Sequence, residues 1–576
     1  MLQINNLRIK FRTSNGWFEA VKGISFQLKP GQTLGIVGES GSGKSVTALS
    51  IMRLLDDKQT QISGDVLFDN INIAQTPEKN MHAIRGNRIA MIFQEPMTSL
   101  NPVLTCGRQI TEAVTLHRKL NKADARQQAI NLFKEVQLPR PESIFDSYPH
   151  QLSGGQRQRV MIAMALSCDP ELLIADEPTT ALDVTVQKTI TDLLLKLQNE
   201  RNMALLFISH DLGVISQVAN EVMVMYKGAV VEQGPVKNIF THPNHPYTQG
   251  LLTCRPSPKL HLKTLPIISD FLMIGTNGQL TSTGLTLAHV QDKYTYPEAE
   301  VVQRKQLLYK QKPILKVDNL NTWFPIKPGW FSKSKEYIKA VNNISFEVYP
   351  GETLGLVGES GSGKTTLGRS ILRLIEPTSG SIIFNDTNLL KLNTNELRHM
   401  RRQIQIIFQD PYSSLNPRKT VGQLLMEPMQ VHGLHNNDTQ RRQKVMELLQ
   451  RVNLLPEHFN RYPHEFSGGQ RQRVVIARAL ALEPQFIICD ESVSALDVSV
   501  QAQILNLLRQ LQQDLGLTYI FISHDLSVIK HISDRIMVIN KGCIEEIADA
   551  EQLYNHPQSA YAQKLIASIP KIEIQP

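Results

Sequence analysis

Cysteine is scarce in this sequence, and the few cysteines are scattered. Five occur among 576 residues, and no two of them form a CxxC pair. Zinc and iron–sulfur sites are built from closely spaced cysteine ligands. The sequence therefore predicts neither zinc nor an iron–sulfur cluster, and it suits a reducing cytoplasm.

Long apolar runs and a strong charge imbalance are also missing. No stretch of about 18 apolar residues occurs, which is the length that crosses a bilayer. The first residues lack the charged and apolar regions of a secretory signal, so we expect neither a membrane span nor a leader. The net charge of +8 is small for a chain of this length, and it does not by itself identify a nucleic acid or a lipid surface as a partner.

The chain does contain four motifs that each occur twice in the same order. The glycine-rich motif Gly38–Ser45 returns as Gly358–Thr365, 320 residues later. Leu-Ser-Gly-Gly-Gln at 152–156 (the signature) returns at 466–470 with phenylalanine in place of leucine. Asp-Glu and Ser-His pairs also return 314 residues later. A single glycine pattern is weak evidence, whereas four ordered motifs at nearly constant spacing indicate a duplicated domain.

The hydrophobic patterns predict an α/β fold in each copy. Alternating polar and apolar residues, as at 2–9 and 341–348, predict half-buried antiparallel strands. Continuous apolar runs such as 34–37 and 204–208 predict strands buried on both faces of a parallel sheet. Helical patterns such as 184–197 alternate with these runs, as they do in βαβ units.

The repeat divides the chain into two domains, because 576 residues exceed what one hydrophobic core serves. We place the first domain at residues 1–254, a linker at 255–312 and the second domain at 313–576. Several helical patterns at roughly 100–170 and 420–480 predict one separate helical subdomain in each domain.

The glycine-rich motif lies between an apolar strand and a helix, which is the context of a P-loop. Glycines there let backbone N–H groups turn toward phosphate oxygens, and the helix N-terminus adds a favourable partial charge. Lys44 and Lys364 are expected to reach the β- and γ-phosphates, and Ser45 and Thr365 to bind Mg²⁺. The alternative is a glycine turn that only starts a helix. The other expected phosphate-binding residues are Gly38, Ser40, Gly41, Gly43, Gly358, Ser360, Gly361 and Gly363.

An acidic pair follows an apolar strand in each copy, Asp176-Glu177 in the first and Asp490-Glu491 in the second. The aspartate can hold Mg²⁺ through water, and the glutamate can polarise the attacking water. An acidic pair also suits a helix N-terminus, which is the structural alternative. A histidine after another apolar strand is expected to contact the γ-phosphate and position that water. The expected catalytic residues are Glu177, Glu491, His210 and His524.

The signature fits two interpretations at once. Serine followed three residues later by glutamine is a capping box at the start of a helix. The two glycines beside the serine leave backbone N–H groups bare, which makes an anion site. The residues expected to bind phosphate here are Ser153, Gly155, Ser467 and Gly469.

The order P-loop, glutamine, signature, Asp-Glu and histidine resembles the nucleotide-binding domains of ABC ATPases, and it covers nearly the whole chain twice. The resemblance implies two tandem P-loop NTPase (RecA-like) domains, each with an antiparallel β subdomain, that bind ATP and Mg²⁺. It also implies an intramolecular head-to-tail dimer in which the signature of one half faces the P-loop of the other. Gln94 and Gln409 match the family glutamine that contacts Mg²⁺, and Asp183 and Asp497 match the loop that bridges the domains. The aromatic residue that stacks on adenine stays open among Phe11, Trp17, Trp323, Phe324 and Tyr337.

A narrower resemblance is to the ATPases of oligopeptide, dipeptide and nickel importers. It is carried by the segments 94–102, 409–417 and 242–252. It implies a peripheral protein at the cytoplasmic face of the inner membrane, with two integral-membrane permease subunits and an external solute-binding protein as partners. Peptides are the expected cargo, and nickel, glutathione and a peptide antibiotic are alternatives. Exposed Met97 and Tyr412 are expected to line the grooves that receive permease helices.

A rival function is that of a soluble tandem ABC protein acting on ribosomes or DNA. Such proteins carry a long charged helical linker or zinc-binding cysteines, and residues 255–312 show neither. We therefore expect no nucleic-acid partner. Ser492 stands where Pro178 follows the glutamate in the first copy, and Phe466 replaces Leu152 before the signature. Neither change removes an expected site residue, so both ATP sites are expected to work.

Overall fold

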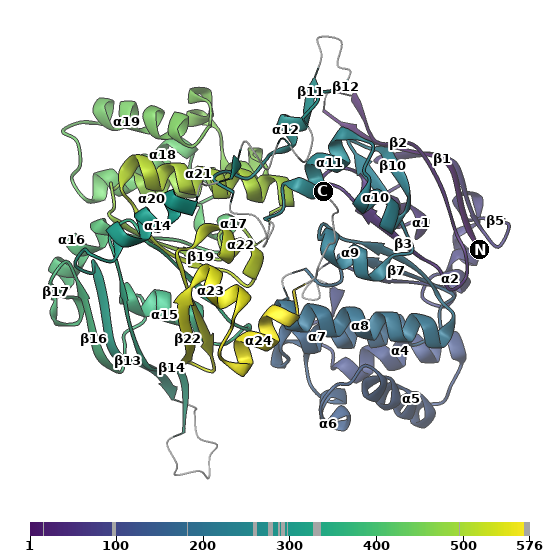
Figure 1. Ribbon diagram of the computed structural model, residues 1–576. Coiled ribbons are helices and arrows are strands. Elements are labelled where there is room, and N and C mark those ends of the chain that lie inside the picture. The colour runs from purple at the N-terminus through teal and green to yellow at the C-terminus, as the bar shows by residue number, and fades with distance from the viewer. Residues whose placement is uncertain are drawn as a thin grey trace. The chain divides into compact units, whose positions relative to one another are not determined.

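The computed structural model describes residues 1–14, 16–94, 99–180, 182–256, 262–274, 280–285, 289, 294–295, 298–325, 336–494 and 496–569 (Figure 1). By their contacts these residues form two compact units. The first contains Met1–Leu252 and Ile268–Leu285, and the second contains Thr253–Ile267 and Thr286–Ile569. Within the described ranges, no helix combines the length and apolarity that crossing a membrane requires.

The first unit is built on two sheets. An antiparallel sheet of order β2-β1-β4-β5 contains β1 (Leu2–Thr13), β2 (Gly16–Leu28), β4 (Thr60–Phe68) and β5 (Ile71–Asn72). A six-stranded sheet of order β10-β9-β3-β8-β7-β6 is parallel except for β10. Its strands are β3 (Thr33–Val37), β6 (Ile89–Ile92), β7 (Leu172–Asp176), β8 (Ala204–Ile208), β9 (Glu221–Tyr226) and β10 (Ala229–Pro235).

The helices of the first unit fall into three groups. Those next to the sheets are α1 (Lys44–Ile51), α2 (Glu78–Ile84), α8 (Val184–Arg201), α9 (Leu212–Val218) and α10 (Val236–Thr241). The helical subdomain consists of α4 (Cys106–Arg118), α5 (Lys122–Glu135), α6 (Pro141–Phe145) and α7 (Gly154–Ala165). The C-terminal elements are α11 (Pro246–Thr253), α12 (Ile268–Phe271), β11 (Leu272–Ile274) and β12 (Leu280–Ser282).

The second unit repeats this architecture. Its antiparallel sheet, of order β14-β13-β16-β17, contains β13 (Leu315–Pro325), β14 (Tyr337–Val348), β16 (Ser379–Phe384) and β17 (Thr387–Asn388). Its six-stranded sheet, of order β18-β19-β20-β15-β21-β22, contains β15 (Thr353–Val357), β18 (Ile404–Ile407), β19 (Phe486–Asp490), β20 (Thr518–Ile522), β21 (Arg535–Asn540) and β22 (Cys543–Asp549). Its helices are α14 (Glu298–Leu308), α15 (Lys364–Ile371), α16 (Thr394–Gln403), α17 (Pro411–Ser414), α18 (Val421–Val431), α19 (Asp438–Arg451), α20 (Gly468–Leu480), α21 (Val498–Leu515), α22 (Leu526–Ile532), α23 (Ala550–Asn555) and α24 (Ala560–Ala567).

The predicted α/β fold is confirmed in both halves. The continuous apolar runs form strands that are buried at every position, as in β3, β7 and β8. The alternating segments form antiparallel strands whose buried and exposed residues also alternate, as in the second half of β2. The helical subdomains lie where the helical patterns predict them. Because each parallel strand ends at the same edge of its sheet, the motifs that follow β3, β7 and β8 are brought together there.

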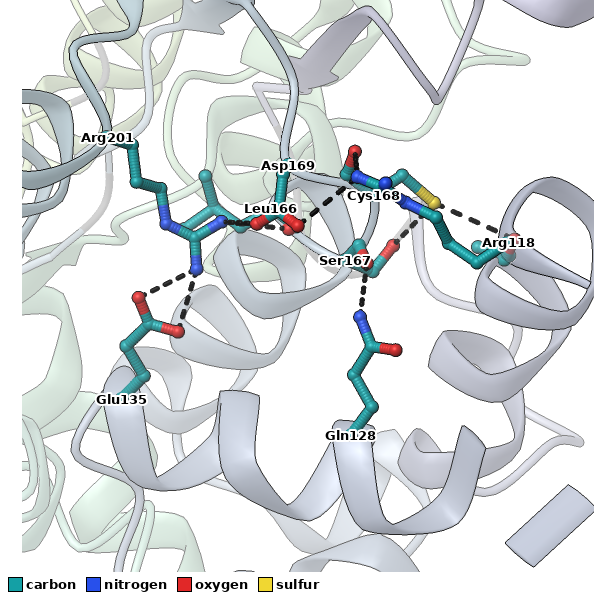
Figure 2. Close-up of polar contacts among 9 residues, drawn as sticks. Arg118, Gln128, Glu135, Leu166, Ser167, Cys168, Asp169 and Arg201 are labelled. Atoms are coloured by element: carbon teal, nitrogen blue, oxygen red, sulfur yellow. Dashed lines mark hydrogen bonds and ion pairs between the residues drawn. The ribbon is translucent and has the colours of Figure 1, made fainter. Parts of the chain in front are cut away.

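A polar cluster joins the first helical subdomain to the rest of its unit. Arg201, at the end of α8, donates to both carboxylate oxygens of Glu135 on α5 at 2.7 and 2.8 Å, and it also pairs with Asp169. Arg118, at the end of α4, donates to the Cys168 carbonyl and to Asp169. Figure 2 shows the two arginines approaching the α7–β7 corner from opposite sides. In the second half, α21 ends on Leu515 where α8 ends on Arg201.

The described parts of the predicted linker pack on both units. Phe271 is buried within the first. In the second, the Leu265 N–H donates to Asn506 on α21 at 2.8 Å, and the Asn506 amide donates back to the Leu265 carbonyl at 2.8 Å. Arg304 on α14 pairs with Asp534, which is 6% exposed, at 2.8 Å. The boundaries at 254 and 312 stay a prediction, because residues 255–312 are divided between the two units.

Candidate ATP-binding and hydrolysis sites

The first P-loop depends on glycines for its backbone conformation, and its lysine side chain donates hydrogen bonds to carbonyl groups of the same loop. Gly38, Gly41 and Gly43 have φ of +150°, +76° and +101°, and an added Cβ at Gly38 would meet the Met225 carbonyl at 2.2 Å. Glycine is therefore required at Gly38 for space as well as for conformation. The buried Lys44 ammonium donates to the Gly38 carbonyl at 2.8 Å and to the Glu39 carbonyl at 2.9 Å. The loop thus presents a lysine at the start of α1, as phosphate binding requires.

The second P-loop has the same geometry. Gly358, Gly361 and Gly363 have φ of +156°, +79° and +106°. The Lys364 ammonium donates to the Gly358 and Glu359 carbonyls, both at 2.8 Å. The two copies therefore match in conformation as well as in sequence.

A hydroxyl and a carboxylate meet beside each P-loop. Ser45 donates to Oδ1 of Asp176 at 3.0 Å, and Thr365 donates to Oδ1 of Asp490 at 2.9 Å. Ser45 and Asp176 also line a cavity of about 540 Å³, which Gln94 borders. Mg²⁺ in nucleotide sites takes one or two protein oxygens and completes its shell with phosphates and water, so these pairs fit it. In the described ranges, no group of three or more His, Cys, Asp or Glu side chains is arranged so that it could hold a metal ion.

Three donors converge on one oxygen of Glu177. Its Oε2 lies 3.0 Å from Nε2 of Gln94, 2.9 Å from the Thr180 hydroxyl and 3.2 Å from Nδ1 of His210. The sequence placed Gln94 and His210 near Mg²⁺ and the γ-phosphate, whereas the structure places both on the glutamate. Thr180 is a contact that the motif analysis did not identify.

The second half has two of these three contacts. Oε2 of Glu491 lies 2.9 Å from Nε2 of Gln409 and 3.4 Å from Nδ1 of His524. Ser494 stands at the position of Thr180, and its buried hydroxyl has no hydrogen-bond partner in the described part of the chain. The Thr180 contact of the first site is therefore not repeated by Ser494 in the second.

The pKa values of the two carboxylates of the first pair, Asp176 and Glu177, are shifted in opposite directions. Burial raises the pKa of Asp176 to about 6, and the hydrogen bond from Ser45 offsets this only in part. Burial also raises the pKa of Glu177, but the hydrogen bond and charge of His210 outweigh it and lower the pKa to about 2. Burial lowers the pKa of His524, whereas its contact with Glu491 raises it, and the net shift is upward. Glu177 is therefore ionised at neutral pH and can accept a hydrogen bond from water.

The predicted capping boxes of both signatures are confirmed. The Ser153 N–H donates to the Gln156 side chain at 3.0 Å, and the Gln156 N–H donates to the Ser153 hydroxyl at 3.3 Å. Ser467 and Gln470 repeat this arrangement at 3.1 and 3.4 Å. Each signature therefore starts a helix, α7 in the first half and α20 in the second.

The second glycine of each signature is required for space. A Cβ on Gly155 would lie 2.9 Å from the Val186 side chain, and a Cβ on Gly469 would lie 2.4 Å from the Val500 side chain. Both valines belong to the first turn of the following long helix, α8 or α21. Any larger residue at these two positions would therefore push against that turn.

The two aspartates of the expected bridging loop both stand at helix starts. Asp183 is the N-cap of α8, and its side chain accepts from the Val186 N–H at 2.9 Å and from the Thr185 hydroxyl at 2.7 Å. Asp497 is the N-cap residue of α21. Each aspartate therefore stands at the start of the helix that packs against its own signature.

The remaining candidates lie on the antiparallel sheets, on α17 or outside the described residues. Trp17 is 47% exposed on the β1–β2 hairpin, and the ring centroids of Trp323 and Tyr337 lie 6.3 Å apart on the β13–β14 hairpin. These positions leave the choice of adenine-stacking aromatic open. Met97 lies outside the described residues. Tyr412 is 64% exposed, with the Arg471 guanidinium 3.9 Å from its ring centroid.

A contact between each P-loop and the C-terminal part of its half was missed by the sequence analysis. The Glu39 N–H donates to the Tyr247 hydroxyl at 3.1 Å, and the Glu359 N–H donates to the Tyr561 hydroxyl at 3.0 Å. The signal that could have found it is the repeat itself, since a tyrosine recurs 314 residues later.

Comparison with known proteins agrees with this geometry. The family model described as "ABC transporter" matches residues 21–180 and 341–494. A second model, described as "Oligopeptide/dipeptide transporter, C-terminal region", matches residues 231–271 and 546–575. The chain therefore belongs to the ABC transporter ATPases. Within that class it carries two tandem cassettes with the C-terminal region of the oligopeptide and dipeptide transporters, as predicted.

Individual relatives extend over almost the whole chain. The glutathione import ATP-binding protein GsiA of Salmonella choleraesuis (strain SC-B67) is 48% identical over 99% of this chain and 89% of its own length. GsiA of Escherichia coli (strain K12) is 47% identical over 100% of this chain and 90% of its own length. Among solved structures, a dimeric post-hydrolysis state of the ATP-binding cassette MJ0796 is 31% identical over 41% of this chain and 98% of that chain, with a TM-score of 0.37.

Proposed function

We propose that both halves of this ATPase bind ATP with Mg²⁺ at their P-loops and that both hydrolyse it. The observation that carries the proposal is the same constellation in each half: a lysine in a glycine loop, a hydroxyl on an aspartate, and a glutamate held by glutamine and histidine. Phosphoryl transfer depends on positioned charge of this kind more than on covalent chemistry.

Each residue of the first site then has a distinct task. Lys44 and the P-loop N–H groups hold the phosphates, and Ser45 and Asp176 would hold Mg²⁺, directly or through water. When bound, Mg²⁺ neutralises negative charge on the phosphate oxygens. Glu177 accepts a hydrogen bond from the attacking water, and His210 keeps that carboxylate ionised and oriented. Gln94 donates to Glu177 and directly precedes the segment that begins at residue 95. This segment is the proposed route to the permease.

The signature of each half is proposed to complete the ATP site of the other half, in an intramolecular head-to-tail dimer. Ser153 and Gly155 would join the second P-loop, and Ser467 and Gly469 the first. The support is the family resemblance, together with the exposed signature serines at the N-termini of α7 and α20, where backbone N–H groups attract anions. Asp183 and Asp497 would lie between the two sites.

The cargo proposed is a short peptide or peptide-like solute, of which glutathione, a tripeptide, is one. The support is the C-terminal region of the oligopeptide and dipeptide type and the identity to glutathione import proteins across the chain. Two permease subunits and an external binding protein would form the path, with this chain peripheral at the cytoplasmic face of the inner membrane. Exposed Tyr412 would contact a permease helix.

The hydrolysis proposal is tested by changing the two glutamates one at a time. Glu177→Gln and Glu491→Gln are each expected to lower the hydrolysis rate at the altered site roughly 10²- to 10³-fold, because each removes a preorganised group. ATP turnover and transport should both be measured in membranes or proteoliposomes that hold the complete transporter. If either single substitution leaves hydrolysis and transport at wild-type rates, the claim of two working sites fails.

The cargo proposal needs a separate measurement. Cells that lack this chain should lose uptake of labelled glutathione or dipeptides, and the wild-type gene should restore it. The Lys44→Ala variant serves as the matched control because it keeps the subunit but removes a P-loop lysine. Loss of nickel uptake with peptide uptake intact would contradict the proposal.

A further inference from the structure

Each P-loop donates a backbone hydrogen bond to one tyrosine in the C-terminal part of its half. Tyr247 is fully buried, and its hydroxyl accepts the Glu39 N–H at 3.1 Å across 208 residues of sequence. Tyr561 accepts the Glu359 N–H at 3.0 Å across 202 residues. Glu39 and Glu359 directly follow the first glycine of their P-loops, so the tyrosines hold the loop where it leaves the strand.

The helices that carry the two tyrosines are fixed in the same way in both halves. Glu232 on β10 accepts from the Asn244 N–H at 2.8 Å and from the His245 N–H at 3.2 Å, just before α11. Glu546 on β22 accepts from the Gln558 N–H at 3.1 Å and from the Ser559 N–H at 2.9 Å, just before α24. A glutamate on the last strand of each sheet therefore positions the start of the helix that carries the tyrosine.

The cap of that helix differs between the halves, whereas the tyrosine is the same. In the first half the Tyr247 N–H donates to Nδ1 of His245 at 3.1 Å. In the second half Ser559 stands at the equivalent position, and its hydroxyl accepts from the Ala562 N–H at 3.1 Å. Two different residues thus make the cap, and Ala560 replaces Pro246. Of the His-Pro-Tyr triplet, the second half keeps the residue that reaches the P-loop.

A P-loop rich in glycine needs such a support. Glycine adopts many backbone conformations, and ordering it costs more entropy than ordering any other residue. In this structure both backbone polar groups of Glu39 are held, the N–H by Tyr247 and the carbonyl by Lys44 at 2.9 Å. When Lys44 turns to the phosphates, as the proposed function requires, it leaves the Glu39 carbonyl, and the tyrosine hydroxyl continues to hold the N–H.

We propose that Tyr247 and Tyr561 are positioning residues that hold the two P-loops in the conformation that binds ATP. The C-terminal region would then act directly on nucleotide affinity, in addition to any role toward the permease. A loop that is ordered before binding loses less entropy when the ligand arrives. Removing the hydroxyl should therefore weaken ATP binding while leaving the chemical step nearly unchanged.

The test uses the full-length chain with Tyr247→Phe and Tyr561→Phe, which remove one oxygen and keep the ring. The Kd for ATP with Mg²⁺ is measured for Tyr247→Phe in a Lys364→Ala background and for Tyr561→Phe in a Lys44→Ala background, so that one P-loop is read at a time. Each tyrosine variant is expected to raise Kd about 3- to 10-fold, the effect of a single neutral hydrogen bond. In the otherwise wild-type chain, KM for ATP should rise by a similar factor and kcat should change less than about twofold.

Two tyrosines serve as matched controls. The Tyr226 ring lies 4.3 Å from the Tyr247 ring, and Tyr554 lies on α23, with the Lys530 ammonium 4.5 Å from its ring centroid. Tyr226→Phe and Tyr554→Phe should bind ATP as the wild type does. The melting temperature without nucleotide is recorded for all four variants, because loss of packing would lower it whether or not the P-loop is affected.

The outcomes separate this inference from the proposed function on which it rests. Loss of one of the two ATP sites in Lys44→Ala, together with a raised Kd for Tyr247→Phe in its single-site background, supports both. Loss of one site in Lys44→Ala with an unchanged Kd for Tyr247→Phe and Tyr561→Phe in their single-site backgrounds overturns the role of the tyrosines alone. An equal rise of Kd in Tyr226→Phe overturns it as well, since the hydroxyl would then not be the cause.

Discussion

At the residue scale, the two proposed catalytic glutamates have an unusual backbone. Glu177 and Glu491 both have φ of +48°, a left-handed conformation that side chains with a Cβ disfavour. The Glu177 N–H donates to the Ile208 carbonyl at 2.9 Å, and the Glu491 N–H donates to the Ile522 carbonyl at 3.0 Å. The strands beside them thus hold the strained residues in place, which is a feature of functional sites.

Because of this strain, we expect glycine at position 177 to give a more stable protein than alanine, the reverse of the usual order in a helix. Both Glu177→Gly and Glu177→Ala lose the carboxylate, but the alanine keeps the strained Cβ. The glycine variant is therefore expected to be more stable by about 1 kcal/mol. Urea unfolding of the full-length chain measures the difference, and Ala129→Gly in α5 is the control, since glycine in a helix should be less stable there. An alanine variant as stable as the glycine variant would contradict the argument.

His245 makes the cap of α11 sensitive to pH. Burial lowers its pKa, whereas nearby Glu232 acts in the opposite direction, and the net shift is downward. Its Nδ1 accepts the Tyr247 N–H, so the neutral ring is the one that caps. As pH falls below about 6.5, the unfolded chain takes up the proton first, and stability is lost over the interval that ends at the lower pKa of the folded state.

Replacing His245 with the residue of the second half tests this. His245→Ser provides a capping oxygen, as Ser559 does in the second half. A serine hydroxyl does not titrate in this pH range. The fall in melting temperature between about pH 7.5 and pH 5.5 is expected to be smaller in His245→Ser than in the wild type. The same fall in both proteins would show that His245 does not contribute to the pH dependence.

At the element scale, the arginine cluster of Figure 2 ties α4, α5 and α8 to one corner of the first unit. Arg201→Leu copies the residue at which α21 ends and removes the bonds to Glu135 and Asp169. We expect local unfolding of α5 to become easier by about 1–2 kcal/mol, because Arg201 is only 19% exposed and one of its nitrogens donates to both carboxylate oxygens of Glu135. Hydrogen exchange of the α5 amides measures this.

The control for Arg201 lies on the same helix. Lys196 pairs with Glu200 at 3.7 Å, and both side chains are more than half exposed. Lys196→Leu should change α5 exchange by less than about 0.5 kcal/mol, as is usual for exposed ion pairs. Equal exchange in the Arg201 and Lys196 variants would show that the cluster does not hold the subdomain.

The elements themselves could be predicted from sequence, whereas several contacts between them could not. The apolar run at 34–37 falls in β3, and the signature predicts the capped start of α7, because periodicity and capping are local properties. The bond between Tyr247 and Glu39 spans 208 residues, and no local pattern records it. Gln94 was placed at Mg²⁺ by resemblance, but its hydrogen bond to Glu177 required the positions of β6 and β7.

At the scale of the whole molecule, the two halves share one chain. If the proposed dimer is intramolecular, the tether sets an effective concentration on the order of millimolar for a short flexible linker. The hydrolysis rate per molecule should then not depend on protein concentration. Assays over a wide dilution series check this, and a rate that climbs steeply with concentration would show that the working dimer forms between chains.

The linker contacts also have a consequence for the order of synthesis. Leu265 exchanges two hydrogen bonds with Asn506, which follows it by 241 residues. At about 5–20 residues per second, a ribosome takes roughly 10–50 s to make that intervening stretch. The backbone at Leu265 therefore emerges long before its partner helix exists and must stay in water until α21 is made. The first half can complete its own sheets in that interval, whereas the backbone at Leu265 is paired only after α21 has been made.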